Sequence, residues 1–416
     1  MWERYVLTLS RIKLVAFFYD TYKAFVTSSF KLVCYLMSAP AKTHITYLDS
    51  IRGLAAFTVI NDHFVTAYNL PCENSFCKDL LDHSPLHIWW DGSAAVSMFF
   101  VLSGLVLSLK YFRLGHQADL NSFKLMPYMT ARLFRIWLPY LVILLISAAF
   151  YWHTVNNPLL KTALPPTEWI VNMWRNHALT ALAMLRESFL LSLPAMVVLL
   201  PQAWTLTIEL VLSLLLPIGL LLAKQGSLWL CLFSMIAILL LGVSPFLMHF
   251  ALGLLIARYY TVIANYLMPK PWLRRFILLV GLLFYTAMST SEHLFSETFM
   301  WIVTGLGAGF IIIYALSSHR TQGFLEWRIL RQLGKVSYSA YLIHMLILLC
   351  LTPYLLTQLE LYSTNRLWLW LSAWLLTIVI VQLLSLLSYY FIEIPSISLG
   401  RKLINGLQKN ITLNKY

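Results

Sequence analysis

An arginine and a histidine lie in one otherwise apolar segment near the start of the chain, YLDSIRGLAAFTVINDHF, residues 47–64. Arg52 and His63 are 11 residues apart, so a helix separates them by about 16 Å along its axis. If Arg52 lies at the edge of a hydrocarbon layer about 30 Å thick, His63 lies near its middle. Ionisable side chains at that depth are costly and are therefore functional candidates. An imidazole there can exchange a proton near neutral pH, which suggests acid–base chemistry.

The polar residues next to His63 leave two interpretations of this histidine open. Asn61, Asp62 and His63 are consecutive, and consecutive helical residues point to different faces of a helix. All three need partners or water, which predicts a polar cavity. The alternative is that His63 only joins two helices through a hydrogen bond, as polar side chains in membrane bundles often do. Asp49 lies three residues before Arg52 and is placed to pair with it.

A second basic group, RLFRIWLP, carries Arg132 and Arg135 one helical turn apart on one face. Guanidinium groups form forked hydrogen bonds with phosphate oxygens, so this pair is a candidate phosphate site. The alternative is that the two positive charges only anchor the end of a membrane span. The same loop adds further positive charge at Lys110, Arg113 and Lys124.

Three further ionisable residues lie inside apolar segments. Glu209, in WTLTIEL, needs a partner or a proton if it lies within a span, and we include it among the candidate catalytic residues. His249, in FLMHFALG, and His344, in YSAYLIHML, are each consistent with helix packing or with a functional site. Neither of them, nor His63, belongs to an HxxxH or HExxH pattern, so we predict no metal site.

The composition indicates the class of protein that must position these side chains. Hydrophobic residues make up 60% of the 416 residues and charged residues only 11%, against roughly 25% charged residues in soluble domains. We therefore predict an all-α, polytopic integral membrane protein without a second globular domain. The net charge of +13 fits retention of basic residues at an anionic cytoplasmic leaflet. No nucleic-acid-binding signature is present.

Ten apolar runs predict ten transmembrane helices with both termini in the cytoplasm. Of the 30 Lys and Arg residues, this orientation leaves only five outside the cytoplasmic segments: Lys78, Lys161, Arg175, Arg186 and Arg366. That bias is the one that the positive-inside rule requires. The runs cover residues 51–68, 93–111, 136–153, 203–223, 228–242, 245–261, 276–290, 298–316, 336–356 and 368–391.

Residues 1–45 are apolar and aromatic, but basic side chains interrupt them before any run reaches the ~20 residues that a span needs. We predict a basic amphipathic segment on the membrane surface, then a transmembrane domain over 46–402 and a cytoplasmic tail over 403–416. A cleaved signal peptide is the alternative, because Ala39-Pro40-Ala41 resembles a cleavage site. Its apolar core is shorter than such peptides need.

Two long loops, 69–92 and 154–202, fall on the predicted outer side. The first contains Cys72 and Cys77, which can pair only if this loop faces an oxidising compartment. The second contains the apolar stretch SFLLSLPAMVVLLPQ, which is interrupted by Pro194 and Pro201 and is too short to span. We predict an interfacial or re-entrant segment there.

Seven sequence strings occur in an order and at spacings typical of one family. They are YLDSIRGLAAFTVINDHF, MFFVLSGLVLSL, RLFRIWLPY, WTLTIELVLSLLLP, FALGLLIAR, GKVSYSAYLIHM and FIEIP. Together they resemble acyltransferase family 3, a family of integral membrane O-acyltransferases, over residues 46 to 402. Two features depart from the family pattern: about 45 additional N-terminal residues, and Asp62 at a variable position to which we assign no family role.

The resemblance implies a fold, a donor and a set of site residues. It implies ten core spans, a cytoplasmic acyl-CoA donor and an acceptor hydroxyl on a cell-envelope glycan or a small metabolite. It implies that Arg52 and His63 are essential and that Arg132 and Arg135 receive the phosphates of the donor. It also implies that the acidic residue of the last string, Glu393, is important.

The predicted reaction is therefore O-acyl transfer, with acetyl-CoA the expected donor. A hydroxyl is a poor nucleophile at neutral pH, and His63 can take its proton as the thioester is attacked. Coenzyme A carries several negative charges that Arg52, Arg132 and Arg135 can hold, and its pantetheine arm can cover the ~16 Å to His63. An acyl-histidine intermediate is a second mechanism.

A secondary transporter or a lipid or glycan flippase is the alternative function, because such proteins also keep charges at the membrane midplane. We find no repeat between the two halves and no matched pair of broken spans, which such proteins usually have. No Walker, GxSxG or kinase pattern is present. The expected partners are the acyl-CoA donor, the hydroxyl acceptor and membrane lipids, and the expected location is the cytoplasmic membrane if the protein is bacterial.

Overall fold

The computed structural model describes residues 45–71, 85–112, 123–156, 162–175, 178–192, 196–290 and 295–413. The chain divides into two units, residues 1–45 and 46–416, and every described helix belongs to the second unit. The predicted N-terminal surface segment and the Cys72–Cys77 pair lie outside the described residues. Regular secondary structure in the described residues is entirely helical.

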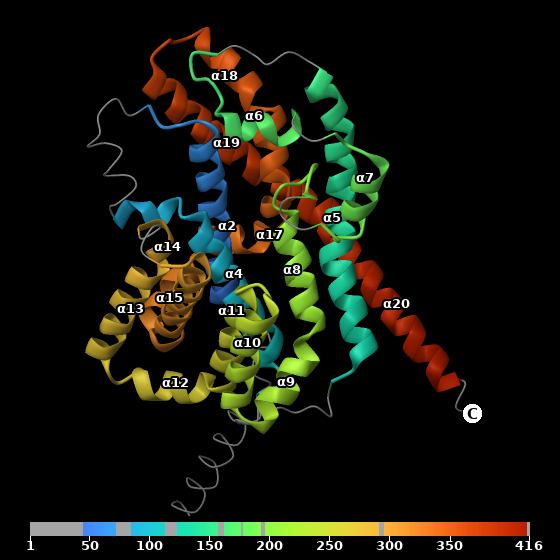
Figure 1. The fold of residues 1–416 in the computed structure, drawn as a ribbon, viewed down its shortest axis with the longest axis vertical. Helices are drawn as coiled ribbons and strands as arrows, with labels where there is room; N and C mark the ends of the chain where they lie inside the picture. The colour runs from blue at the N-terminus through green and yellow to red at the C-terminus, as the bar shows by residue number, and fades with distance from the viewer. Residues whose placement is uncertain are drawn as a thin grey trace, which may run out of the picture. The chain divides into compact units, whose positions relative to one another are not determined.

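Figure 1 shows the helices in chain order. Their bounds are α2 Thr46–Ala67, α4 Gly92–Leu109, α5 Leu125–Asn156, α6 Glu168–Arg175, α7 Ala181–Ser188, α8 Ala203–Leu214, α9 Leu216–Gln225, α10 Ser227–Leu241, α11 Phe246–Arg258, α12 Tyr260–Leu267, α13 Pro271–Tyr285, α14 Ala287–Thr290, α15 Glu297–Ser317, α16 His319–Leu325, α17 Arg328–Cys350, α18 Thr352–Glu360, α19 Arg366–Ser388 and α20 Ile394–Leu413. Two short segments complete them, the 3-10 helix η1 at Pro85–Trp89 and the π-helix η3 at Tyr389–Glu393.

Each of the ten predicted apolar runs contains a helix, but not ten of these helices qualify as spans by length and composition. Among the described residues, five helices are long and apolar enough to cross a membrane, or seven if each bent pair counts as one span. The bends are 50° between α8 and α9 and 69° between α11 and α12. The helices α10 and α13 have only 15 residues each, and the polar residues of α2 exclude it. The chain is an integral membrane protein, and the number of ten spans is not confirmed.

Two glycines allow α2 and α17 to pack backbone against backbone. A Cβ atom on Gly53 would collide with the backbone of Gly334, and a Cβ on Gly334 would collide with the carbonyl of Asp49. Small residues of this kind let membrane helices approach closely. Further along, His63 of α2 meets His344 of α17. Gly53 contacts Gly334, and the later residue His63 contacts the later residue His344, so α2 and α17 run parallel.

Other contacts fix the directions of further helix pairs. In α4 and α11, Phe100 stacks on Phe246 and Gly104 lies against Phe250, so these helices also run parallel.

Between α2 and α19 the order is reversed. The Trp374 indole bonds to Asn61, whereas Trp370 meets Phe64. The helices α2 and α19 are therefore antiparallel.

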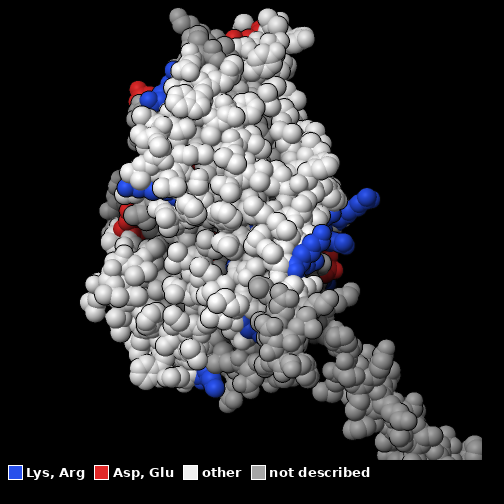
Figure 2. All heavy atoms as spheres, turned by 90° about the vertical axis from the view of Figure 1, so that its right-hand side faces the viewer, with Lys and Arg blue, Asp and Glu red and all other residues white. Residues whose placement is uncertain are grey.

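The surface of the bundle is apolar over large areas. Figure 2 shows one face on which Lys, Arg, Asp and Glu side chains are few and separated by broad uncharged areas. Large apolar side chains are exposed elsewhere too, including Leu240 and Leu241 of α10, which are 77% and 74% exposed. Exposed apolar area of this extent marks a surface that meets lipid or protein.

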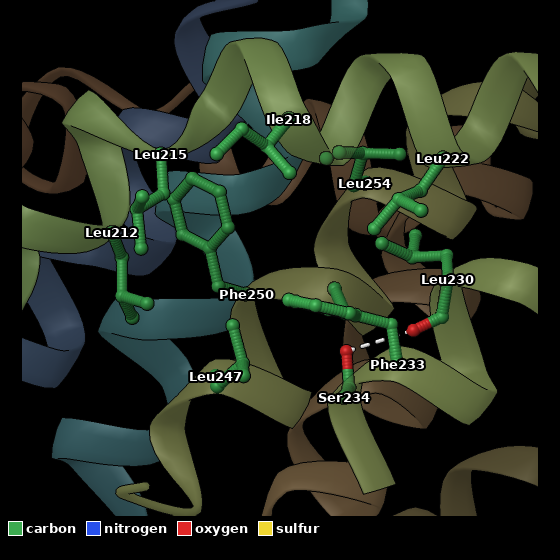
Figure 3. A pocket seen from close by; sticks show the side chains of 12 residues that line it. Leu212, Leu215, Ile218, Leu222, Leu230, Phe233, Ser234, Leu247, Phe250 and Leu254 are labelled. Atoms are coloured by element: carbon green, nitrogen blue, oxygen red, sulfur yellow. Dashed lines mark hydrogen bonds between the residues drawn. The ribbon is translucent and has the colours of Figure 1, made fainter. Parts of the chain in front are cut away.

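An apolar cavity of about 60 Å³ lies between α8, α9, α10 and α11, beside the α8–α9 bend (Figure 3). Its lining is leucine, isoleucine and phenylalanine with two small residues and one serine. The hydroxyl of that serine, Ser234, donates to the carbonyl of Leu230 in its own helix, 2.9 Å away. The cavity therefore presents no group that could do acid–base chemistry.

Candidate active site

Two histidines from α2 and α17 form a hydrogen-bonded pair. The Nδ1 atom of His63 lies 2.8 Å from Nε2 of His344, and Nδ1 of His344 lies 2.8 Å from the carbonyl oxygen of Tyr341. A carbonyl can only accept, so His344 carries its proton on Nδ1 and, as a neutral ring, accepts at Nε2. His63 must then donate from Nδ1, which leaves the lone pair of its Nε2 available. The pair therefore holds His63 in the tautomer that a general base requires.

A glutamine at the start of α8 bonds to the carbonyl at which this series of hydrogen bonds ends. The Nε2 atom of Gln202 donates to the carbonyls of Tyr341 and Leu342, at 3.2 and 2.8 Å. The hydroxyls of Thr205 and Tyr341 lie 2.6 Å apart. Gln202 and Tyr341 are both buried. Hydrogen bonds from α8 thus fix the segment of α17 that orients His344.

The stretch before α8 is itself held by a fully buried carboxylate. Glu187, at the end of α7, accepts backbone N–H bonds from Val198, Leu199 and Leu200, the closest at 2.6 Å. Burial raises the pKa of this carboxyl above its ordinary value, although the three N–H donors favour the charged form. The predicted re-entrant stretch is neither a span nor a regular helix in its described residues. Hydrogen bonds to Glu187 hold the end of this stretch in place, directly before Gln202.

The other side of the His63 ring is partly open. The Nε2 atom of His63 lies 3.9 Å from Oδ2 of Asp62, and the two side chains are 22% and 33% exposed. The indole of Trp169, from α6, lies 5.5 Å from the His63 ring at 37°. Asp62 also packs directly against Gly92 at the start of α4. The available nitrogen of His63 therefore lies near a carboxylate, and an indole lies beside the same ring.

The opposite end of α2 collects the predicted charged residues. Arg52 donates from Nη1 to Oδ1 of Asp49 at 3.3 Å. Electrostatic interactions connect Arg52 with Arg135 of α5, Glu209 of α8 and Glu393 of the π-helix. Residues that are far apart in the sequence therefore form one charged cluster here, while the continuous helix keeps Arg52 about 16 Å from His63 along its axis.

Serine hydroxyls orient the two glutamates of this cluster. Ser103 donates to Oε1 of Glu209 at 3.1 Å, and Ser339 donates to Oε2 of Glu393 at 2.9 Å. The Glu393 side chain is buried, and the π-helix Tyr389–Glu393 that carries it lies at the junction of α19 and α20. Single π turns inside α-helices are frequent at functional sites because they re-aim a side chain.

Arg132 and Arg135 lie in the same cluster but in different surroundings. Arg132 is half-buried, with its guanidinium 5.9 Å from the centre of the Tyr128 ring, and it interacts electrostatically with Arg135, Glu209 and Arg52. Arg135 is exposed. A guanidinium over an aromatic ring is held in place without losing its charge. The pair therefore offers one fixed and one accessible guanidinium to an anionic ligand.

Two predicted polar residues turn out to be structural. Asn61 donates to the carbonyl of Trp89 at 3.1 Å and accepts from the indole of Trp374 at 3.1 Å. Of the three consecutive polar residues, Asn61 therefore finds its partners in neighbouring helices and not in a polar cavity. His249 lies against Gly305, and its Nε2 donates to the carbonyl of Trp301 at 2.8 Å. It joins α11 to α15 and lies outside both polar clusters.

Sequence reasoning missed three residues around the candidate base and the partner of a fourth. His344 was a candidate without a defined partner, and Gln202, Glu187 and Trp169 were not singled out. Each contacts its partner across more than ten residues of chain, so no local spacing indicates the contact. Within the described residues, no group of three or more His, Cys, Asp and Glu side chains is arranged to hold a metal ion.

Comparison with known protein families finds one match. A family model described as an acyltransferase domain, that of acyltransferase family 3, covers residues 45–390. Comparisons with curated proteins and with solved structures find no match. The matched region contains the histidine pair and the charged cluster except for Glu393, which lies three residues beyond its end.

Proposed function

The chain belongs to acyltransferase family 3, and from this premise we propose that it moves an acyl group from acyl-CoA, most simply acetyl-CoA, to a hydroxyl of an envelope glycan, lipid-linked sugar or small metabolite. The observation that carries the proposal is the hydrogen-bonded series His63–His344–Tyr341 carbonyl. That series leaves one imidazole nitrogen free to accept a proton on the partly open side of the ring. O-acyl transfer needs a base in that state.

In the proposed reaction His63 acts as the general base. The acceptor hydroxyl gives its proton to Nε2 while its oxygen bonds to the thioester carbonyl carbon. Collapse of the tetrahedral intermediate breaks the carbon–sulfur bond, and the proton held by His63 passes to the departing thiolate. The products are the ester and free coenzyme A, and the imidazole returns to its starting state. His344 stabilises the transient imidazolium by accepting from its Nδ1–H.

The charged cluster is the proposed site for the donor's phosphates. Arg132 and Arg135 supply forked donors, and Arg52 adds a third guanidinium toward His63. Glu209 and Glu393 hold these arginines in orientation through their electrostatic interactions with them. A nucleotide bound there and an acyl group at His63 are separated by about 16 Å along α2, a distance that a pantetheine arm can cover.

We further propose ten spans with both termini in the cytoplasm. In the ten-span order, α2 and α17 are the first and ninth spans and α4 and α11 the second and sixth, so each pair should run parallel, as their contacts indicate. The first and tenth spans, α2 and α19, should be antiparallel, and they are. The lysine and arginine bias then places the charged cluster on the cytoplasmic side, in the cytoplasmic membrane if the protein is bacterial.

The test is release of free coenzyme A from acetyl-CoA by membranes that contain the full chain and native acceptor. His63→Ala should lower kcat by about 10²- to 10⁴-fold, the usual contribution of a general base. Arg135→Ala is the matched comparison, because it should raise the KM for acetyl-CoA with a much smaller change in kcat. Thioester cleavage that persists at the wild-type rate in folded His63→Ala protein would contradict the proposal. Acyl-His63 after incubation with donor alone would replace general-base catalysis with the acyl-histidine mechanism.

A further inference from the structure

The open side of His63 carries two side chains that the proposed reaction does not use, those of Asp62 and Trp169. The Nε2 atom of His63 and Oδ2 of Asp62 lie 3.9 Å apart and both side chains are partly exposed. Both atoms are hydrogen-bond acceptors when His63 is the base. A hydroxyl has a single O–H, so an alcohol that donates to both, at about 2.8 Å from each, needs two hydroxyls close together. Hydroxyls on adjacent carbons of one molecule meet that requirement.

An indole lies beside the same imidazole ring and is held there. Trp169 is 36% exposed, and its ring centre lies 5.5 Å from that of His63. Just before it, Thr167 donates from its backbone N–H to the carbonyl of Ala67 and from its hydroxyl to the carbonyl of Thr66, at 2.9 and 2.7 Å. The start of α6 is thereby tied to the end of α2, so the indole keeps its place above His63.

We propose that Asp62 and Trp169 form the acceptor subsite and select a ring compound with hydroxyls on adjacent carbons. The flat indole packs against the apolar C–H face of the ring. Asp62 accepts a hydrogen bond from the hydroxyl next to the reacting one, and His63 Nε2 takes the proton of the reacting hydroxyl. This inference rests on the proposed acyl transfer and adds the residues that choose the acceptor.

The contact between Asp62 and Gly92 does not occupy the carboxylate fully. A Cβ at Gly92 would overlap the Asp62 carboxylate, so glycine is what lets the side chain lie there, toward His63. An ionised carboxylate has about four lone-pair sites, which leaves acceptor capacity for a ligand. If Asp62 only bonded to the backbone of Gly92, its loss would affect stability alone, whereas the loss of a subsite residue also changes the choice between acceptors.

The experiment compares two model acceptors, cis-1,2-cyclohexanediol and cyclohexanol, with radiolabelled acetyl-CoA and purified full-length protein. Wild-type protein should acetylate the diol with a kcat/KM at least tenfold above that for cyclohexanol. Asp62→Ala should reduce this ratio to about one, and Asp62→Asn should give an intermediate ratio. Trp169→Ala should raise the KM for both alcohols by tenfold or more, and Trp169→Phe should restore most of the loss. Glu168→Gln, its exposed neighbour on α6, is the control and should behave as wild type.

Each other outcome has a defined meaning. Equal use of the two alcohols by wild-type protein, or an unchanged ratio in Asp62→Ala, would overturn the subsite. So would the absence of transfer to either alcohol while native membranes still cleave acetyl-CoA in a His63-dependent way. Loss of thioester cleavage in native membranes with wild-type protein would instead overturn the proposed function itself.

Discussion

Two buried histidines of this protein look alike in sequence and differ in what their second ring nitrogen meets. His344 and His249 are 0% and 1% exposed, and each uses one nitrogen to bond a backbone carbonyl. The remaining nitrogen of His344 accepts from His63. The remaining nitrogen of His249, Nδ1, is buried without a hydrogen-bond partner. A buried histidine that bonds only to a backbone carbonyl, such as His249, joins two helices. A buried histidine that also fixes the tautomer of a second imidazole, as His344 does for His63, can take part in a reaction.

Among the changes that test the contrast between His344 and His249, the largest effect is expected at His344. His344→Ala should lower kcat by about 10²-fold, because His63 loses the acceptor that fixes its tautomer and supports its positive charge, a role worth up to about 10⁴-fold in hydrolytic triads. His344→Gln should recover part of this loss, since its amide oxygen can accept from His63 Nδ1. The measurement is kcat for acetyl-CoA cleavage at saturating donor. Equal activity of both variants with wild type would remove His344 from the reaction.

An intermediate effect is expected where His249 packs. Gly305→Ala would place a methyl group inside the His249 ring, which should destabilise the protein by about 1–3 kcal/mol, as overpacking usually does. The double variant Gly305→Ala, His249→Ala should recover most of that stability because the space for the methyl group is restored. Thermal unfolding of the detergent-solubilised chain measures both. Additive losses in the double variant would show that the two residues do not compete for one space.

The smallest effect is expected from His249→Phe. The substitution keeps an aromatic ring between Phe246 and Gly305, removes the unpartnered Nδ1 and gives up one hydrogen bond to Trp301. Stability should change by about 1 kcal/mol or less, and the specific activity of the folded protein should stay within twofold of wild type. A tenfold drop in kcat without loss of stability would place His249 in the reaction and end the contrast with His344.

Local sequence patterns were sufficient to locate the long apolar helices and the charged residues, but not short helices such as α6, α7 and α16. Apolar runs marked ten helical segments, because helix formation and lipid exposure depend on neighbouring residues. Arg132 and Arg135 could be paired from a three-residue spacing. The predicted number of ten spans is not confirmed, because α11 and α12 are separated by a bend and α10 and α13 are short, features that apolar runs do not indicate.

The contacts that define the site were not readable from local patterns. His63 and His344 are separated by 281 residues, and Gln202 reaches Leu342 across 140. In the sequence Glu187 is one charged residue in an amphipathic stretch, and nothing near it indicates that it accepts hydrogen bonds from the backbone of Val198, Leu199 and Leu200. Asn61 shows the opposite case, because a polar residue within an apolar segment proved to bond to the backbone carbonyl of Trp89 and the indole of Trp374. Depth in the membrane indicates that a polar group needs partners but does not say which.

The glycine contact between α2 and α17 sets the spacing of the reactive pair. Gly53 precedes His63 by ten residues, and Gly334 precedes His344 by the same ten. The two helices are parallel and touch at these glycines. The equal spacing therefore places both imidazoles at the same level along the helix axes and on the facing sides of the two helices. One residue inserted into either stretch would turn its imidazole by about 100°. The glycine contact thus fixes the register between the two helices. Neither stretch of ten residues can gain or lose a residue without separating the two imidazoles.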